Sequence, residues 1–298
     1  MLSIRKEETT LRIIVPIKQV PETSNVKMDP ETGTMIREGV EQIINPLDLY
    51  AIEEGIILKE RFGGEVIVLS MGPPKAEIAI REAIAMGCDN GILLTDKAFA
   101  GADTYATSYT ISQAVRRLGN FDLILCGERA TDGDTGQVGP GIGAWLGIPF
   151  VTYVSSIKEV NADYVVVERM VEEGYEVLKV KLPALLTVVK EINYPRLPTL
   201  RGKQRAKKID IIKWGPEDID AEKNKIGLNG SPTRVVKIDK PKIARNGKIF
   251  TVKDERDIEK AIDLFIDFLQ KKRDFIRKKE LAWKKTVSGH LEKQKKEG

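Results

Sequence analysis

Residues 122–146 read DLILCGERATDGDTGQVGPGIGAWL, and this stretch decides the fold class. It opens with a short apolar run, Asp122 to Cys126, which is typical of a strand buried on both faces. A small, polar, glycine-rich loop follows and leads directly into a helical segment around residues 136–146. A strand, a loop and a helix in this order indicate one unit of a parallel α/β sheet.

The chain before this stretch repeats the same alternation. Apolar, β-branched runs at 11–18, 65–71 and 91–94 predict buried strands, and helices are predicted between them. Asn45 and Asp103 are the expected N-caps of the first and third helices, with Gly63-Gly64 and Gly119 as stops. We therefore predict an α/β fold with an open, mostly parallel, Rossmann-like sheet that carries helices on both faces.

Later segments read differently. Residues 19–41 predict a long loop or a small hairpin, and residues 153–157, 164–170, 175–180 and 185–190 predict further strands, the second and third of them antiparallel. Beyond residue 193 the chain is rich in Pro and Lys, which favours an extended, exposed segment, and residues 209–250 favour an arm. From about Asp254 a helix is predicted, with an amphipathic stripe formed by Ile258, Ala261, Ile262, Phe265, Phe268 and Leu269. The expected division is a nucleotide-binding domain at 1–192 and a region at 193–298 with a recognition loop, an arm and a basic-tailed helix.

Composition excludes several classes of protein. The net charge of the 298-residue chain is +4, but residues 271–298 carry 11 basic and 4 acidic side chains, and the remaining 270 residues carry 37 and 40. The body is therefore not a nucleic-acid binder. No apolar run is long enough to span a bilayer, and the polar N-terminus lacks the core of a signal peptide, so a cytoplasmic protein is expected, with any membrane association made through partners.

Few residues offer side-chain chemistry. Cys88 and Cys126 follow or end apolar runs and are expected to be inert core thiols, and the single histidine, His290, lies in a polar tail. A zinc site, an iron–sulfur cluster and a histidine-dependent hydrolase are not supported. Neither a P-loop nor a G-x-G-x-x-G after the first strand is present, which disfavours an NTPase and a plain NAD-dependent dehydrogenase. The adjacent acidic pairs 53–54 and 172–173 are interpreted as surface charge.

The glycine-rich loop is the best candidate ligand site. Glycines allow close approach of the backbone, and the free N–H groups of the following helix favour an anion, so a phosphate or pyrophosphate is the natural occupant. Thr131, Thr135 and Gln137 can add donors, while Asp132 and Asp134 are expected to cap the helix or to bind a ribose. A purely structural turn is the alternative.

Six segments in order carry a resemblance to a known family. They are RIIVPIKQVPET (12–23), the run from Asn45-Pro46 to residue 60, VIVLSMGP (66–73), EAIAMGCD (82–89), residues 122–146 and LPALLTVVKEINYPRLPTL (182–200). Along residues 11–210 the chain resembles the beta subunits of electron transfer flavoproteins. That resemblance implies a heterodimer with an alpha subunit that holds one FAD, and AMP or a second FAD in this chain.

The resemblance also implies site residues, and the strand ends and the loop indicate the same region. The candidate cofactor-binding residues are Pro16, Asn45, Pro46, Asp48, Met71, Gly72, Asp103, Thr104, Ala130, Thr131, Asp132, Gly133, Asp134, Thr135, Gly136, Gln137, Val138 and Gly139. The candidate partner-binding residues are Pro195, Arg196 and Leu200, in a segment similar to the family's recognition loop. No catalytic residue and no metal ligand is predicted.

Two stretches, KQVPET…DPETGT…REGV and ADTYAT (102–107), resemble electron-bifurcating members of the family. In such a member the flavin takes hydride from NADH and sends one electron to the alpha-subunit FAD and one to a low-potential acceptor such as ferredoxin. A flavin dehydrogenase or a quinone oxidoreductase is the other expected partner. The resemblance thus implies an electron carrier rather than a stand-alone enzyme, with NADH oxidation as an activity of the complex. The alternatives are a simple one-flavin carrier with structural AMP and an adenine-nucleotide-binding regulatory protein.

Overall fold

The computed structural model describes residues 10–22, 41–234, 251–252 and 254–294. They fall into two units, Met1–Val236 and Lys237–Gly298. The assignment of residues 1–192 to a nucleotide-binding domain stays a prediction.

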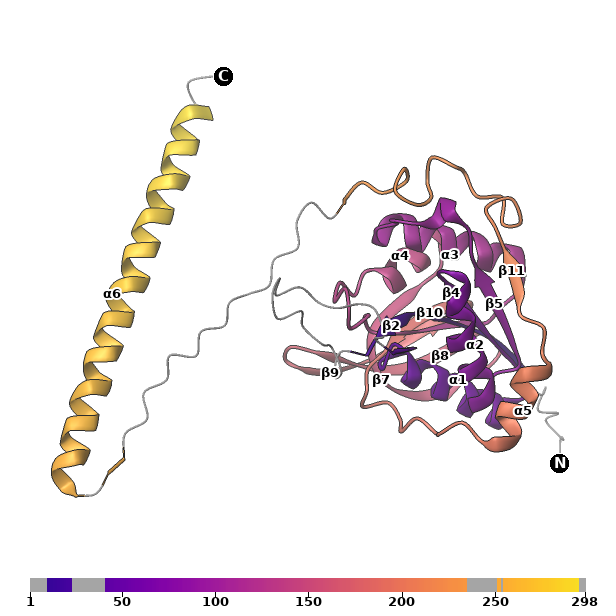
Figure 1. Ribbon diagram of the computed structural model, residues 1–298, viewed down its shortest axis with the longest axis horizontal. Coiled ribbons are helices and arrows are strands. Elements are labelled where there is room, and N and C mark those ends of the chain that lie inside the picture. Colours follow the sequence, from indigo (N-terminus) through magenta and orange to yellow (C-terminus); the bar gives the residue numbers. More distant parts are fainter. Residues whose placement is uncertain (1–9, 23–40, 235–250, 253, 295–298) are drawn as a thin grey trace, which may run out of the picture. The chain divides into compact units, whose positions relative to one another are not determined.

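The first unit is built on one large, mostly parallel sheet (Figure 1). Within the described residues its nine strands follow the order β11-β5-β4-β1-β6-β10-β7-β8-β9, and all neighbours from β11 to β7 are parallel. The strands are β1 (Leu11–Ile17), β4 (Gly64–Met71), β5 (Asn90–Leu94), β6 (Leu123–Gly127), β7 (Phe150–Val160), β8 (Tyr164–Val171), β9 (Gly174–Lys181), β10 (Ala184–Val188) and β11 (Ile212–Trp214). The predicted fold class is confirmed.

Helices cover both faces of this sheet, as predicted. The helices of the first unit are α1 (Asp48–Phe62), α2 (Glu77–Met86), α3 (Thr104–Leu118), α4 (Val138–Leu146) and α5 (Leu200–Lys208), with short 3-10 turns η2 (Pro74–Ala76) and η3 (Lys97–Phe99). Apolar residues of α1 and α2 pack on one face of the strands, and those of α3 and α4 pack on the other.

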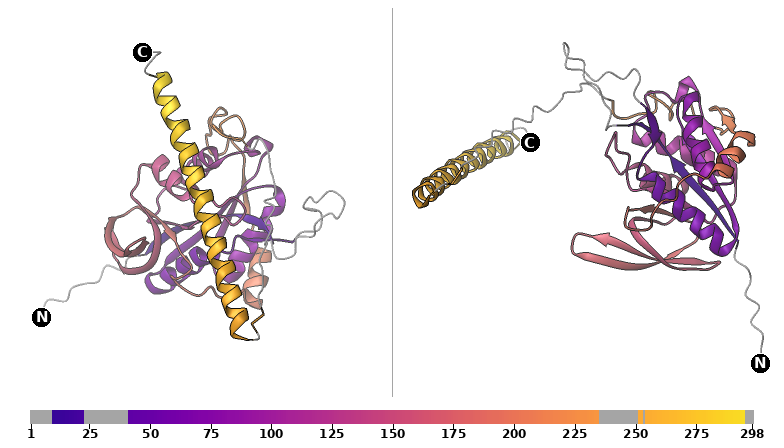
Figure 2. Two further views of the ribbon diagram at one scale, coloured as in Figure 1. Left: turned by 90° about the vertical axis from the view of Figure 1, so that its left-hand side faces the viewer. Right: turned by 60° about the horizontal axis from the view of Figure 1, so that its bottom comes forward.

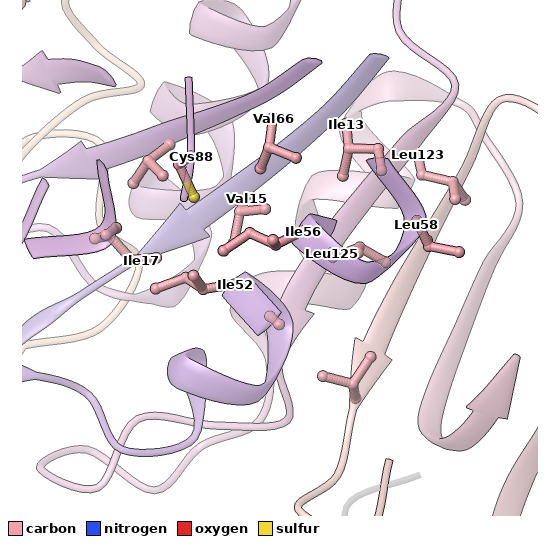
Figure 3. Packing of buried hydrophobic residues seen from close by; sticks show 14 of the residues in the cluster. Ile13, Val15, Ile17, Ile52, Ile56, Leu58, Val66, Cys88, Leu123 and Leu125 are labelled. Atoms are coloured by element: carbon pink, nitrogen blue, oxygen red, sulfur yellow. The ribbon is translucent and has the colours of Figure 1, made fainter. Parts of the chain in front are cut away.

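The core is formed by alternate residues of the central strands. Ile13, Val15 and Ile17 of β1 point toward Ile52 and Ile56 of α1 (Figure 3). Burial of each such side chain contributes roughly 1.5–3 kcal/mol. Both thiols belong to this core, as predicted, and burial raises the pKa of Cys88 to about 12.

Antiparallel strands complete the sheet where the sequence changes character. β7 pairs with β8, and β8 pairs with β9 in continuous register, which confirms the predicted antiparallel pair. Figure 2 shows β8 and β9 extending beyond the helix layers as a long hairpin. The ends of the predicted loop at 19–41 pair as β2 (Gln19–Pro21) and β3 (Gln42–Ile44), a small antiparallel ladder. Residues 23–40 lie outside the described residues.

The segment expected to be extended contains a helix instead. α5 begins after Thr199, whose hydroxyl caps it by accepting from the N–H of Gly202, and it packs on α2 through buried Ala206. The predicted arm is also wrong for its first part, because β11 joins the edge of the sheet and Ile219 and Ile226 are buried. Sparse apolar residues with irregular spacing gave no periodic signal for this packing.

The second unit contains the helix α6 (Glu255–Gln294), which confirms the helix predicted from about residue 254. The larger apolar residues of the predicted stripe are exposed: Ile258, Ile262, Phe265, Phe268 and Leu269. Among the described residues, no helix combines the length and apolarity needed to cross a membrane. The same residues contain no group of three His, Cys, Asp or Glu side chains that could hold a metal ion.

Two glycines with positive φ give a test of the fold. Gly64 (φ +106°) begins β4, and a Cβ there would lie 1.9 Å from the carbonyl oxygen of Leu11, whereas Gly119 (φ +82°) has open space around it. Alanine at Gly119 adds only backbone strain, about 1–2 kcal/mol. Gly64→Ala must also displace β1 and is expected to lower the free energy of unfolding by more than about 3 kcal/mol. Urea unfolding of both variants checks this, and equal losses would contradict the β1–β4 geometry.

Candidate functional site

The predicted site lies where the strand order reverses. β4 flanks β1 on one side and β6 flanks it on the other, and the loops after β1 and β6 both leave from the carboxyl edge of the sheet. In open α/β sheets, this switch point forms the crevice that binds ligands. Residues 18–19, 45–48 and 128–138 follow or flank these strand ends. We call the region where they meet the β1/β6 crevice, after the place where such sheets bind ligands.

Asn45 organises this crevice, although not as the helix cap that the sequence suggested. Its buried side-chain amide donates to the Arg129 carbonyl and to Asp48 Oδ1, both at 2.9 Å, and its Oδ1 accepts from the Thr131 N–H at 3.1 Å. α1 starts three residues later, with Leu47 at the N-cap position and no side-chain cap. The amide therefore serves the glycine-rich loop instead of the helix end.

Asp48 supplies the buried carboxyl group of the site. Its Oδ2 accepts from the backbone N–H of Lys18 at 2.7 Å, so this carboxylate joins the end of β1 to the start of α1. Burial raises the pKa of Asp48 from 3.8 to about 7, against hydrogen bonds from Asn45, Lys18 and Gly127 that lower it. With its oxygens engaged inside the protein, Asp48 shapes the crevice rather than facing it.

Gly127 was not identified from the sequence as a site residue, yet the geometry requires it. A Cβ at this last residue of β6 would lie 2.4 Å from Asp48 Oδ1 and 2.9 Å from the Asp48 backbone nitrogen. Only glycine lets α1 start this close to β6. A glycine directly after the apolar run 123–126 was the available signal.

The glycine-rich loop is held by its own ion pairs. Lys18 Nζ lies 2.7 Å from Asp132 Oδ1, and Arg129 Nε lies 3.1 Å from Asp134 Oδ1. Neither aspartate caps α4, so that part of the prediction is wrong. Lys18 was missed as a site residue, and its place directly after β1 was the signal for it. The side chains of residues 131–135 remain exposed at the surface of the loop.

The first turn of α4 follows this loop and has no side-chain cap. Gln137 occupies the N-cap position with helical backbone angles, and its Oε1 accepts from the Thr104 hydroxyl at 2.8 Å. First-turn N–H groups have no partner within a helix and attract anions. Close packing fixes this end, because a Cβ on Gly139 would lie 2.6 Å from Thr187 Cγ2 and one on Gly141 2.7 Å from Ser108 Oγ.

The first turn of α3, in contrast, is capped by a side chain of this chain. Asp103 caps it as predicted, with Oδ1 accepting from the N–H groups of Tyr105 and Ala106, while Oδ2 accepts from the N–H and hydroxyl of Thr233. Partial burial raises the pKa of Asp103, but these hydrogen bonds outweigh it and hold the pKa below its ordinary value. The Asp103 carboxylate is engaged within the chain, and Thr104 is the residue of this pair that reaches the α4 end.

The remaining candidates line the neighbouring strand ends. Pro16 is buried in β1 beside Leu69 of β4, and Met71 and Gly72 are half-buried at the end of β4, where the Gly72 N–H donates to the Leu94 carbonyl. A separate cavity of about 640 Å³ lies beyond β5 and β11 and is lined by residues 96–100 and 215–229. It contains none of the predicted cofactor residues, so its size does not identify the site.

Of the three candidate partner residues, Arg196 is the one that ion pairs with α1. Arg196 pairs with Glu53 and Glu60, whereas Leu200 is 82% exposed and Pro195 is half-buried. Glu53 and Glu54 are both buried, so their interpretation as surface charge is wrong, although it holds for the exposed pair 172–173. Their partners lie about 140 residues later in the chain, which no local pattern could show.

The fold is that of a doubly wound α/β protein, whose strand order reverses at the β1/β6 switch point. The model of the electron transfer flavoprotein domain matches residues 32–219. The chain is 48% identical over 256 residues to the electron transfer flavoprotein subunit beta of Thermoanaerobacterium thermosaccharolyticum, which covers 85% of this chain and 97% of the relative.

Two further relatives have other names. The caffeyl-CoA reductase-Etf complex subunit CarD of Acetobacterium woodii is 48% identical over 242 residues, with 81% and 92% coverage. Protein FixA of Bradyrhizobium diazoefficiens is 43% identical over 235 residues, with 76% and 82% coverage. The chain belongs to the electron transfer flavoprotein family, within the group of beta subunits and FixA proteins.

The raised pKa of Asp48 predicts a pH-dependent stability. The folded carboxyl, with a pKa of about 7, binds a proton that the unfolded one, at 3.8, releases. The contribution of this proton to the free energy of unfolding is full below about pH 4 and is lost as the pH rises through 7. The free energy of unfolding falls by up to about 1.4 kcal/mol per pH unit in this range. Urea unfolding between pH 5 and 8 should show the wild-type protein losing stability relative to Asp48→Asn as the pH rises.

Glu176→Gln is the control, because Glu176 is a half-exposed carboxylate on β9. The free energy of unfolding of Glu176→Gln should stay close to that of the wild-type protein from pH 5 to pH 8. A wild-type-to-Asp48→Asn difference that does not change with pH would show that Asp48 is ionised throughout.

Proposed function

We propose that this chain pairs with an electron transfer flavoprotein alpha subunit and binds an adenine nucleotide in the β1/β6 crevice. The heterodimer carries electrons between NADH or a flavin dehydrogenase and a quinone- or ferredoxin-linked acceptor. The observation that carries the proposal is the uncapped first turn of α4, which follows the glycine-rich loop beside the buried Asn45–Asp48 pair. Family membership supports the electron-transfer role and the alpha-subunit partner.

The residues of the crevice suit the two ends of an adenine nucleotide differently. The first turn of α4 offers backbone N–H groups to phosphate oxygens, with Thr131 and Thr135 exposed on the loop before it. Buried Pro16 and half-buried Met71 provide an apolar floor at the ends of β1 and β4 for the adenine ring. AMP and the adenylate half of FAD share this chemistry.

We favour FAD in this chain, with the electron-bifurcating role that the sequence resemblance implies. When bound, a flavin supplies hydride acceptance and one-electron transfer. The chain's own residues bind and orient it, and no titratable group is assigned to a proton-transfer step. One relative is named as a subunit of a caffeyl-CoA reductase-Etf complex, which supports a beta subunit that works beside a reductase. A one-flavin carrier with AMP in this crevice is the second candidate.

Nucleotide content distinguishes these two candidates. The chain is co-purified with its alpha subunit, and the nucleotides are extracted and separated by chromatography. About two FAD and little AMP per heterodimer are expected, since each subunit would hold one flavin. One FAD and one AMP would support the simple carrier, and no nucleotide in this chain would contradict the site.

Asn45 gives a second test of the same crevice. Asn45→Ala removes hydrogen bonds to the Arg129 carbonyl and the Thr131 N–H, so the loop loses its anchor at a cost of about 1–3 kcal/mol. We expect the nucleotide content of this chain to fall while the alpha-subunit FAD is retained. Asn120→Ala, at an exposed position before β6, is the control and should leave both unchanged. Full nucleotide content in Asn45→Ala would place the ligand elsewhere.

A further inference from the structure

Two buried carboxylates on α1 have no part in the nucleotide crevice. Glu53 and Glu54 are 4% and 7% exposed and lie on the second turn of the helix, past the Asp48 end. A carboxylate this deeply buried must be paired or hydrogen-bonded. Both carboxylates find their hydrogen-bond partners in residues 193–196, a few residues before the candidate docking residue Leu200.

Arg196 is the principal partner. Its Nε and Nη2 lie 2.9 Å from the oxygens of Glu53, and its Nη1 lies 2.6 Å from Oε1 of Glu60, which is two turns further along the same face of the helix. The backbone N–H of Arg196 also donates to Glu53 Oε2 at 3.0 Å. The same carboxylate therefore fixes both the main chain and the guanidinium.

A second contact lies three residues earlier. The side-chain amide of Asn193 donates to Glu54 Oε2 and to the Tyr50 carbonyl, both at 3.0 Å. We call the five side chains of Asn193, Arg196, Glu53, Glu54 and Glu60 the α1 latch. It holds residues 193–196 along a helix that is itself buried against the sheet.

Another set of contacts fixes the chain after Leu200, this time on α2. A Cβ on Gly202 would lie 2.0 Å from the carbonyl oxygen of Ala85, so α5 approaches α2 at its backbone. Arg205 Nη2 donates to the Ile84 carbonyl at 2.8 Å. Residues 194–200 are therefore held at one end by α1 and at the other end by α2.

Between these anchors, large apolar side chains point away from the protein. Tyr194 is 96% exposed, Leu197 84% and Leu200 82%. Exposed apolar groups on a fastened segment suit a partner with an apolar pocket, because a preordered segment loses little conformational freedom on binding. Arg196 is already paired within the chain and is not free to bind a carboxylate of the partner.

We infer that Arg196 is a positioning residue, which presents Tyr194, Leu197 and Leu200 to a flavoprotein partner by locking the segment onto Glu53 and Glu60. This inference rests on the proposed pairing with electron-transfer partners and on the docking role that the sequence resemblance implies for residues 195–200. The apolar side chains contact the partner, and the α1 latch keeps the segment ordered.

The test uses the full heterodimer, with Arg196→Lys and Glu60→Gln as latch variants and Leu200→Ala as a contact variant. Lysine keeps the charge but cannot bridge two carboxylates in a fork. Arg117→Lys, at an exposed arginine on α3, is the matched control. Amide hydrogen exchange of residues 191–200 is measured without partner, and KM and kcat are measured with a flavin-dependent acyl-CoA dehydrogenase as the electron donor.

Arg196→Lys should speed exchange of the segment by at least about tenfold, since local opening becomes easier. It should also raise the KM for the dehydrogenase at unchanged kcat, with Glu60→Gln intermediate. Leu200→Ala should raise KM with normal exchange, and Arg117→Lys should change neither.

Two results would overturn the inference. Normal exchange with a raised KM in Arg196→Lys would make the guanidinium a direct partner contact. Faster exchange with an unchanged KM, while Leu200→Ala raises KM, would show that order in the segment does not matter for docking. An unchanged KM in Leu200→Ala would instead contradict the proposed docking role, and exchange would still decide whether the latch orders the segment.

Discussion

The buried carboxylate of Asp48 is the interaction on which the crevice depends. It joins the end of β1 through the Lys18 N–H, the segment before α1 through Asn45, and β6 through the close approach at Gly127. Three segments far apart in sequence thus share one acceptor group. A buried carboxyl group without hydrogen-bond donors is energetically costly. Displacing any of these segments would remove such a donor, so the strand ends are held in one arrangement.

α1 connects this crevice to the candidate docking segment. Asp48 lies in its first turn, and Glu53 and Glu60 lie on later turns, so at 1.5 Å per residue they are about 8 and 18 Å further along the helix. The helix carries a buried acidic side chain near each region, Asp48 and Glu53. Each of them binds a segment that lies far away in the sequence. A single rigid element therefore sets the geometry of both the proposed nucleotide site and the proposed partner site.

Local patterns in the sequence predicted the sheet, most of the helices and the glycine-rich loop, because periodicity and caps such as Asp103 act over a few residues. They failed where the deciding contact is distant. Asn45 has the chemistry of an N-cap, but Arg129 and Thr131 compete for its side chain. The acidic pair at 53–54 resembles surface charge until Arg196 and Asn193 arrive from beyond β10, and α5 forms although its interior contributes only Ala206 to the core.

Ion pairs within the chain also occupy the charged side chains around the glycine-rich loop. The charged side chains around the loop neutralise one another, as Lys18 with Asp132 and Arg129 with Asp134 show. What remains for a ligand is backbone: the first turn of α4, brought to the edge of the sheet by Gly139 and Gly141 where larger residues would collide with Thr187 and Ser108. In the proposed function, such a site would bind and orient a nucleotide through peptide dipoles, and the bound cofactor would supply the chemistry.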